Sequence, residues 1–233
     1  MSSQSVFTTE DLALLFRTIE PDIPKTTINW RIYNLVQNSI LERVGRGFFK
    51  FGETQTFYIE TTPELKLLHR SLCKSFPFTR YCIWNTGILN EFSRHQSNQA
   101  FTLIEVEKES VQAVFYNIKE TRKNVFLAPS NEVIENYLLS AKAPIIIKPL
   151  ISEAPIQRVQ DISVPVIEKI LVDLYCEPDL FFAYQGKEMR TVFRDIFLKY
   201  TVNQSAMLRY SNRRGRKNAF TAYLNRIQIF GNK

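Results

Sequence analysis

Glycine is scarce in this chain and is concentrated in one short stretch, ERVGRGFFKFG, which spans residues 42–52. The chain has seven glycines among 233 residues, and three of them, Gly45, Gly47 and Gly52, lie in this stretch. Glycine adopts positive φ at low steric cost, and the turn of a tight β-hairpin requires that conformation. The residues on either side of the first two glycines have the pattern of short strands. The stretch therefore predicts a β-hairpin that presents Arg46 at its tip.

A first helix is predicted well before this hairpin, over the sequence TTEDLALLFRTI. Thr8 suits the capping position, and two acids follow in the first turn, where negative charge stabilises a helix. Pro21 and Pro24 then end the helix. Its apolar face is expected to hold Leu12, Leu15, Phe16 and Ile19.

A second helix is predicted over TTINWRIYNLVQNSIL, beginning at Thr26 or Thr27. At helical spacing, its buried stripe consists of Ile28, Ile32, Leu35 and Val36. The opposite face combines aromatic and polar side chains, which is typical of a surface that contacts a partner. That face carries Trp30, Tyr33 and Gln37, with Asn29 and Asn34 on its flanks.

The order of these elements is typical of a winged helix-turn-helix, in which the second helix enters a DNA groove and the hairpin forms the wing. We expect this DNA-binding domain to span residues 1–55. On the wing, Arg46, with Arg43 and Lys50 beside it, is placed to contact phosphates or the minor groove. Winged helices usually have a third helix, so residues 1–7 or the helix after the wing must supply the missing support.

The rest of the chain predicts a connecting helix over residues 56–79 and a larger α/β domain over residues 80–233. Runs typical of strands alternate with helical patterns there, which indicates a small, partly parallel mixed sheet. A helix capped by Ser163 and three further helices end the chain. The predicted fold class is therefore α+β. The expected strands are 80–84, 101–107, 124–128 and 144–150, and the expected helices between them are 87–94, 110–120 and 131–141.

Positive charge is concentrated at the end of the chain. Residues 180–233 hold 11 Lys and Arg against two Asp and Glu, whereas residues 1–52 hold six against five. A local excess of this size predicts an anionic partner, which is DNA, RNA or an acidic protein surface; a solvated face is the alternative. The low charge of the first 52 residues also leaves open a domain that contacts only proteins. The predicted basic patch consists of Arg209, Arg213, Arg214, Arg216 and Lys217.

Composition excludes several other classes. Three widely spaced cysteines and two histidines suit neither a disulfide framework nor a zinc site, so we expect no cofactor and no metal. The most apolar stretch, residues 143–151, is interrupted by two prolines and a lysine and is too short to span a membrane. The N-terminal sequence lacks the apolar core of a secretion signal, so a cytoplasmic location is expected.

One enzymatic alternative deserves a test, a metal-dependent nuclease built on the α/β domain. The sequence TLIEVEKE places Glu105 and Glu107 on one face of a predicted strand, where paired carboxylates hold metal ions in nucleases. Lys108 falls on the other face, which is the wrong phase for the acid-and-lysine strand of such enzymes. The sequence therefore favours a protein without enzymatic activity.

Two stretches together resemble a known family. NWRIYNLVQNSILERVGRGFFKF is similar to the N-terminal winged helix of AbiE-type antitoxins, which belong to type IV toxin–antitoxin pairs. SVPVIEKILVDLYCEPDLFFAYQGKEM, followed by LRYSNRRGRK, is similar to the C-terminal domain of a related bacterial group. One departure is Asn38-Ser39, which stands where the family often has a glycine at the helix end.

The resemblance implies a bacterial phage-defence regulator. Such a protein binds inverted repeats in its own promoter as double-stranded DNA and represses its own gene. Its second domain opposes a nucleotidyltransferase toxin encoded nearby. Carried over to this chain, the implied DNA contacts are Thr27, Trp30, Arg31 and Asn34 on the helix and Arg46 on the wing.

Overall fold

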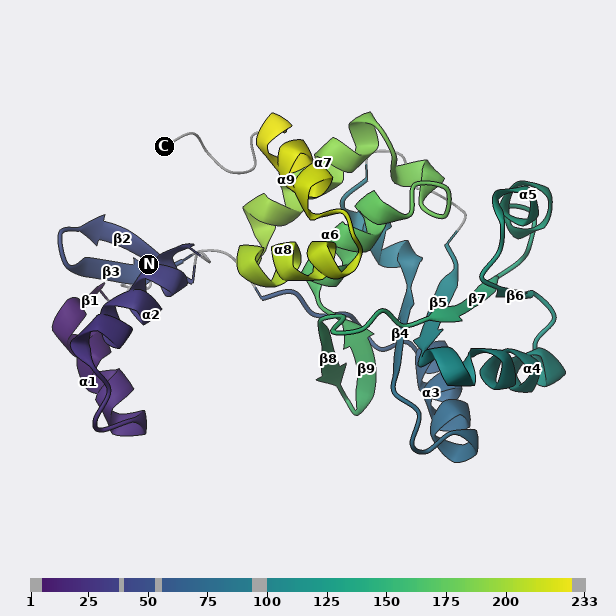
Figure 1. Cartoon of the computed structure of the whole chain (residues 1–233), viewed down its shortest axis with the longest axis horizontal. Coiled ribbons are helices and arrows are strands. Elements are labelled where there is room, and N and C mark those ends of the chain that lie inside the picture. The colour runs from purple at the N-terminus through teal and green to yellow at the C-terminus, as the bar shows by residue number, and fades with distance from the viewer. Residues whose placement is uncertain (1–5, 38–39, 53–55, 94–99, 228–233) are drawn as a thin grey trace. The chain divides into compact units, whose positions relative to one another are not determined.

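A computed structural model describes the chain except for residues 1–5, 38–39, 53–55, 94–99 and 228–233 (Figure 1). The described residues mix helices with small sheets, so the fold is α+β. Their contacts divide the chain into two compact units. The smaller unit comprises Met1–Thr56 and Phe197–Gln204, and the larger comprises Phe57–Ile196 and Ser205–Lys233. Asn38 and Ser39, where the sequence departs from the antitoxin pattern, lie outside the described residues.

The smaller unit packs two helices against a three-stranded antiparallel sheet. The first helix begins with a capping box: the Thr8 hydroxyl accepts a hydrogen bond from the Asp11 amide, and the Asp11 carboxylate accepts one from the Thr8 amide. The pKa of Asp11 is lowered mainly by its hydrogen bond with the Thr8 backbone amide and further by its hydrogen bond with the Thr8 side chain. The elements are β1 (Val6–Thr8), α1 (Thr9–Ile19), α2 (Lys25–Gln37), β2 (Leu41–Gly45) and β3 (Phe48–Phe51), with sheet order β1-β3-β2.

Apolar residues from every layer form the core of this unit. The predicted α2 stripe contributes two fully buried members, Ile28 and Ile32. On α1 the predicted apolar face is buried only at Leu12, because Leu15 and Ile19 are 56% and 77% exposed. The support expected from residues 1–7 is a strand, β1, which pairs with β3. The buried core consists of Leu12, Ile23, Ile28, Ile32, Leu41 and Phe49.

The glycine stretch forms the predicted hairpin. Strands β2 and β3 pair antiparallel and are joined by a turn at Arg46 and Gly47, and Gly47 has a φ of 81°. The register shifts between Arg43 and Gly45, so this glycine lies at a bulge. The Gly47 carbonyl accepts a hydrogen bond from the Thr9 amide at 3.0 Å. The start of α1 therefore holds the turn in place.

The larger unit contains a four-stranded mixed sheet in the order β4-β5-β7-β6. Strand β4 runs antiparallel to β5, and β5, β7 and β6 are parallel to one another. Every residue of β5 is buried, as expected for a central strand covered on both faces. The strands are β4 (Tyr81–Asn85), β5 (Thr102–Val106), β6 (Val125–Leu127) and β7 (Ile145–Pro149).

The crossover connections of the sheet are helical. Between β5 and β6 lies α4 (Val111–Thr121), and between β6 and β7 lies α5 (Asn131–Val133), which continues as a π-helix over Ile134–Leu138. These connections match the predicted helices closely. The helix expected at residues 87–94 is shorter, a 3₁₀ helix over Thr86–Glu91.

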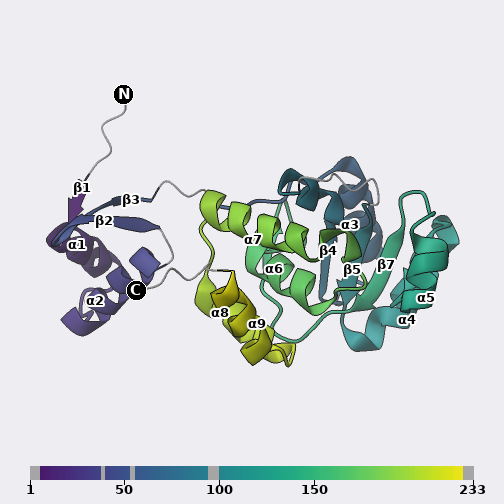
Figure 2. The same ribbon diagram turned by 90° about the horizontal axis from the view of Figure 1, so that it is seen from above.

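Further helices lie wholly or mostly in the larger unit, and the last four of those described group together in both views (Figure 1, Figure 2). The end of α7 from Phe197 and the first residue of α8, Gln204, belong to the smaller unit. A small hairpin, β8 (Ile156–Val159) and β9 (Ile162–Pro165), precedes this group and was not predicted. The prediction that Ser163 caps a helix is wrong, because Ser163 lies in β9 and Val166 occupies the cap. The helices are α3 (Pro63–Ser75), α6 (Ile167–Cys176), α7 (Lys187–Lys199), α8 (Gln204–Arg213) and α9 (Lys217–Arg226).

Candidate functional site

The outer face of α2 presents large aromatic side chains to solvent. Trp30 is 64% exposed and Tyr33 is 54% exposed, and Asn29 is exposed on the flank of this face. Thr27 and Asn34 are half-buried on the same helix. Exposed tryptophan is uncommon unless a binding partner covers it, because its ring carries a large apolar surface. The predicted DNA-contacting helix therefore has its aromatic residues at the surface.

Arg31 is positioned differently from its neighbours on α2. Its guanidinium donates to the Glu20 carboxylate at 2.7 Å, and its Cζ lies 5.5 Å from the centroid of the Phe16 ring. Both partners belong to α1 or follow it directly. Arg31 therefore joins the two helices, and its charge is compensated within the unit.

The hairpin provides cations of two kinds. Lys50 forms an ion pair with Glu42 at 3.0 Å across the two strands, whereas Arg43 lies with its Cζ 5.5 Å from the centroid of the Phe49 ring. Arg46 is exposed at the turn. Within the described part of the chain, neither Arg43 nor Arg46 forms an ion pair with an acid. Among the described residues, these two arginines are therefore the cations of the hairpin that no acid pairs with.

The predicted basic patch separates into an exposed and an inward part. Arg209, Arg216 and Lys217 are exposed, and Arg213 forms an ion pair with Glu153. Arg214 departs from the predicted surface position, because its side chain is only 11% exposed. The backbone turns at Gly215, which has a φ of 67°.

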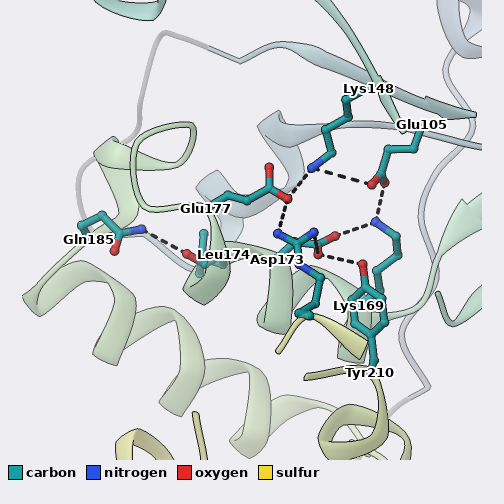
Figure 3. A network of polar contacts seen from close by, with 9 residues as sticks. Glu105, Lys148, Lys169, Asp173, Leu174, Glu177, Gln185 and Tyr210 are labelled. Atoms are coloured by element: carbon teal, nitrogen blue, oxygen red, sulfur yellow. Dashed lines mark hydrogen bonds and ion pairs between the residues drawn. The ribbon is translucent and has the colours of Figure 1, made fainter. Parts of the chain in front are cut away.

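Arg214 belongs to a buried network of three acids and three bases in the larger unit (Figure 3). Its guanidinium donates to Asp173 at 3.2 Å and to Glu177 at 2.6 Å. Lys148 bridges Glu177 and Glu105, with its Nζ 3.7 Å from the Glu105 carboxylate. Glu105 and Lys148 are register partners on the neighbouring parallel strands β5 and β7. The network therefore links the sheet to the end of α6.

Lys169 is the centre of this network. Its ammonium, fully buried, donates to Glu105 and, at 2.5 Å, to Asp173 one helical turn along α6. The hydroxyl of Tyr210 donates to the other oxygen of Asp173 at 2.9 Å. Burial alone would lower the pKa of Lys169, but the carboxylates of Asp173 and Glu105 outweigh it and hold that pKa well above its usual value. Lys169 is therefore charged at neutral pH although it lies inside the protein.

Asp173 is shifted in the complementary direction. Burial tends to raise its pKa, but the positive charges of Lys169, Lys148 and Arg214 lower it below the ordinary value. Both partners of the central pair are therefore charged at neutral pH. The sequence signal for this pair was the four-residue spacing of a lysine and an aspartate among the apolar residues of the predicted helix. Nothing in the sequence pointed to Lys148, Glu177 or Tyr210 as their partners.

The network bears directly on the nuclease alternative. The Glu105 carboxylate forms ion pairs with Lys148 and Lys169. Glu107 lies beyond the end of β5 and is exposed. Lys108 is exposed as well. Among the described residues, no group of three or more His, Cys, Asp and Glu side chains is placed to hold a metal ion. The two glutamates predicted as a pair are thus in separate environments.

A cavity of about 300 Å³ opens beside the network at the carboxyl ends of β6 and β7. Ligands of open α/β sheets bind outside the carboxyl ends of the strands. The network contributes Lys148 and Glu177 to the polar lining of this cavity, and the apolar lining includes Ile134, Ile146 and Leu180. Through Lys148 and Glu177 the network therefore reaches a cavity that is open to solvent. The sequence did not indicate this cavity.

Comparison with models of known protein families identifies the family of this chain. A search of curated proteins finds no match. In the described part of the chain, no helix is long and apolar enough to cross a membrane. The match to the family covers residues 27–229, which begins within α2 and includes the hairpin, the sheet and the buried network. The chain therefore belongs to a family of unknown function, DUF6577.

Proposed function

We propose that the protein is a DNA-binding transcriptional regulator. In this proposal the smaller unit is a winged helix, α2 is the recognition helix and the β2–β3 hairpin is the wing. The observation that supports it is the combination of exposed Trp30 and Tyr33 on α2 with an exposed Arg46 at the hairpin turn that forms no ion pair among the described residues. A helix followed directly by a hairpin with such side chains has the layout by which winged helices contact duplex DNA.

The two parts of this surface have different roles in the proposal. Arg46 and Arg43 contact phosphates or the minor groove, which positions the protein on DNA. Trp30 and Tyr33 contact bases or sugars in the major groove, where apolar side chains meet thymine methyl groups. Arg31 and Lys50, which the sequence placed among the DNA contacts, are already paired with Glu20 and Glu42. We assign them to the architecture of the unit.

The resemblance to AbiE-type antitoxins supports a finer proposal, in which the protein represses its own promoter and opposes a nucleotidyltransferase toxin encoded nearby. Inverted repeats in that promoter require two copies of the DNA-binding unit. The larger unit then carries the activity against the toxin. Co-expression with the neighbouring gene tests this part: rescue of growth by the full chain supports it, and unrelieved toxicity contradicts it.

The DNA-binding proposal is tested by titrating the purified full chain with the duplex upstream of its own gene and with a scrambled duplex of equal composition, each at two salt concentrations. Arg46→Gln is compared with Arg17→Gln, which removes the same charge from α1 in the same unit. We expect selective binding of the upstream duplex, lost in Arg46→Gln and kept in Arg17→Gln. Equal, weak binding of both duplexes would indicate a unit that contacts proteins instead.

A further inference from the structure

A second cluster of cations lies in the larger unit, at the edge of the sheet opposite the cavity beside Lys148. Arg122 and Lys123 follow the end of α4, and Lys142 precedes β7. These three residues line one small cavity of about 140 Å³ at the amino ends of β6 and β7. In the part of the chain that the structure describes, none of the three forms an ion pair. The cavity has one acid in its lining, Glu64 of α3.

The backbone around this cavity is held in a defined shape. The side-chain amide of Asn124 donates to the Lys142 carbonyl at 2.7 Å, and the Ile145 amide donates to the Asn124 carbonyl at 2.8 Å. Ala143 has a φ of 48°, a conformation that is strained for a residue with a β-carbon. Strain of this kind persists where the surroundings enforce it, often at binding sites. The segment that carries Lys142 is therefore fixed against the start of β6.

The size and charge of the cavity together define its ligand. Pockets for whole organic molecules are larger, roughly 300–1,000 Å³, so this cavity fits a single compact group. Three basic residues against one acid in the lining favour an oxyanion, and arginine in particular donates paired hydrogen bonds to phosphate. We infer that Arg122, Lys123 and Lys142 form a binding site for a phosphate group.

Two sources of that phosphate differ in chemistry. A small phosphomonoester carries close to two negative charges at neutral pH, whereas each phosphodiester of a nucleic acid carries one. The probes are therefore glycerol phosphate for the monoester and a thymidine dinucleotide for the diester. Binding of glycerol phosphate alone assigns the site to a phosphorylated small molecule, and binding of both assigns it to the phosphate group in either setting.

The test is isothermal titration calorimetry of the full chain at low ionic strength, where charge-assisted binding is least screened. The double variant Arg122→Gln/Lys142→Gln is expected to weaken saturable binding of glycerol phosphate at least about tenfold, since two charge-assisted hydrogen-bonding groups are lost. Glu64→Gln is expected to strengthen it, because it removes the one acid of the lining. A merely structural role of these residues would not produce opposite signs.

Two controls separate this site from other positive charge. Lys119→Gln removes a lysine of α4 whose Nζ lies 5.2 Å from the centroid of the Phe115 ring and which does not line the cavity. Arg46→Gln removes the hairpin arginine on which the DNA-binding proposal depends. Both variants are expected to bind glycerol phosphate as the wild type does. No saturable binding of either probe, or equal weakening in Lys119→Gln, would overturn the inference without touching the DNA-binding proposal.

Discussion

Arg46 and Arg214 are the same residue type, each beside a turn that contains a positive-φ glycine, yet their environments are opposite. Arg46 projects from the hairpin of the smaller unit, exposed and without an ion pair in the described structure. Arg214 turns inward in the larger unit and donates to Asp173 and Glu177. The comparison shows that a basic residue in a basic stretch has no fixed role. Its role depends on whether acids from distant elements reach it.

The largest effect is expected from removing the central base of the buried network. Lys169→Met leaves the carboxylates of Glu105 and Asp173 buried beside an apolar side chain. Breaking a buried pair in this way typically lowers the free energy of unfolding by about 3–5 kcal/mol. Urea unfolding monitored by circular dichroism measures it. Lys187→Met, an exposed lysine of α7, is the control, and a loss below about 1 kcal/mol in Lys169→Met would contradict a structural role for the network.

The buried network should also make stability depend on pH in acid. The folded state lowers the pKa of Asp173 below its ordinary value of 3.8. A lowered pKa stabilises the folded state above the unfolded pKa, and this stabilisation is lost as pH falls through the folded pKa. Unfolding free energies measured from pH 6 down to pH about 2 should therefore fall less steeply in Asp173→Asn than in the wild type. Parallel profiles would show that Asp173 does not carry its charge in the folded protein.

A smaller effect on stability is expected when lysine replaces the inward-facing Arg214. The two nitrogens of Arg214 donate to two different acids, and the single ammonium of lysine cannot reproduce that fork. Arg214→Lys is expected to lower the free energy of unfolding by about 1–3 kcal/mol. Arg216→Lys, two residues away and exposed, should change it by less than about 0.5 kcal/mol. Equal losses of stability in Arg214→Lys and Arg216→Lys would contradict a special role for the inward-facing arginine.

The smallest effect on stability is expected at the hairpin. Arg46→Gln should leave the free energy of unfolding within about 0.5 kcal/mol of the wild type, because the side chain is exposed and unpaired among the described residues. The slope of log affinity against log salt concentration is negative. Under the DNA-binding proposal, the same change makes this slope less steep by about one unit, because one phosphate contact is lost. Binding measured over a salt series gives the slope. An unchanged slope would mean that Arg46 does not contact a phosphate.

Local patterns predicted local structure well, and most elements followed from them. The four strands of the larger sheet and the capped helix after Thr62 follow from apolar runs, turn residues and caps. The β8–β9 hairpin was not predicted, because its turn, Gln160-Asp161, adopts positive φ at both residues without a glycine to indicate it. Leu15 and Ile19 fit a helix face, but periodicity does not say whether another element covers that face.

The candidate sites were predictable to different degrees for a related reason. The hairpin arginine lies between its own glycines, so a short stretch of sequence is enough to place it. The network depends on contacts across long separations, since Glu105 lies 64 residues from Lys169 and Tyr210 lies 37 residues from Asp173. The cavity with Arg122 and Lys142 likewise joins two loops that only the parallel pairing of β6 and β7 brings together. Local sequence patterns do not predict contacts between residues that are this far apart in the chain.

The burial of Lys169 has a practical consequence. Amine-reactive reagents modify lysines that water reaches, and the ammonium of this residue is fully buried and held between two carboxylates. In the folded protein it should resist acetylation while exposed lysines such as Lys187 react. Its modification then requires opening of the larger unit. Mass spectrometry of the acetylated peptide that contains Lys169 would therefore measure how fast the larger unit opens.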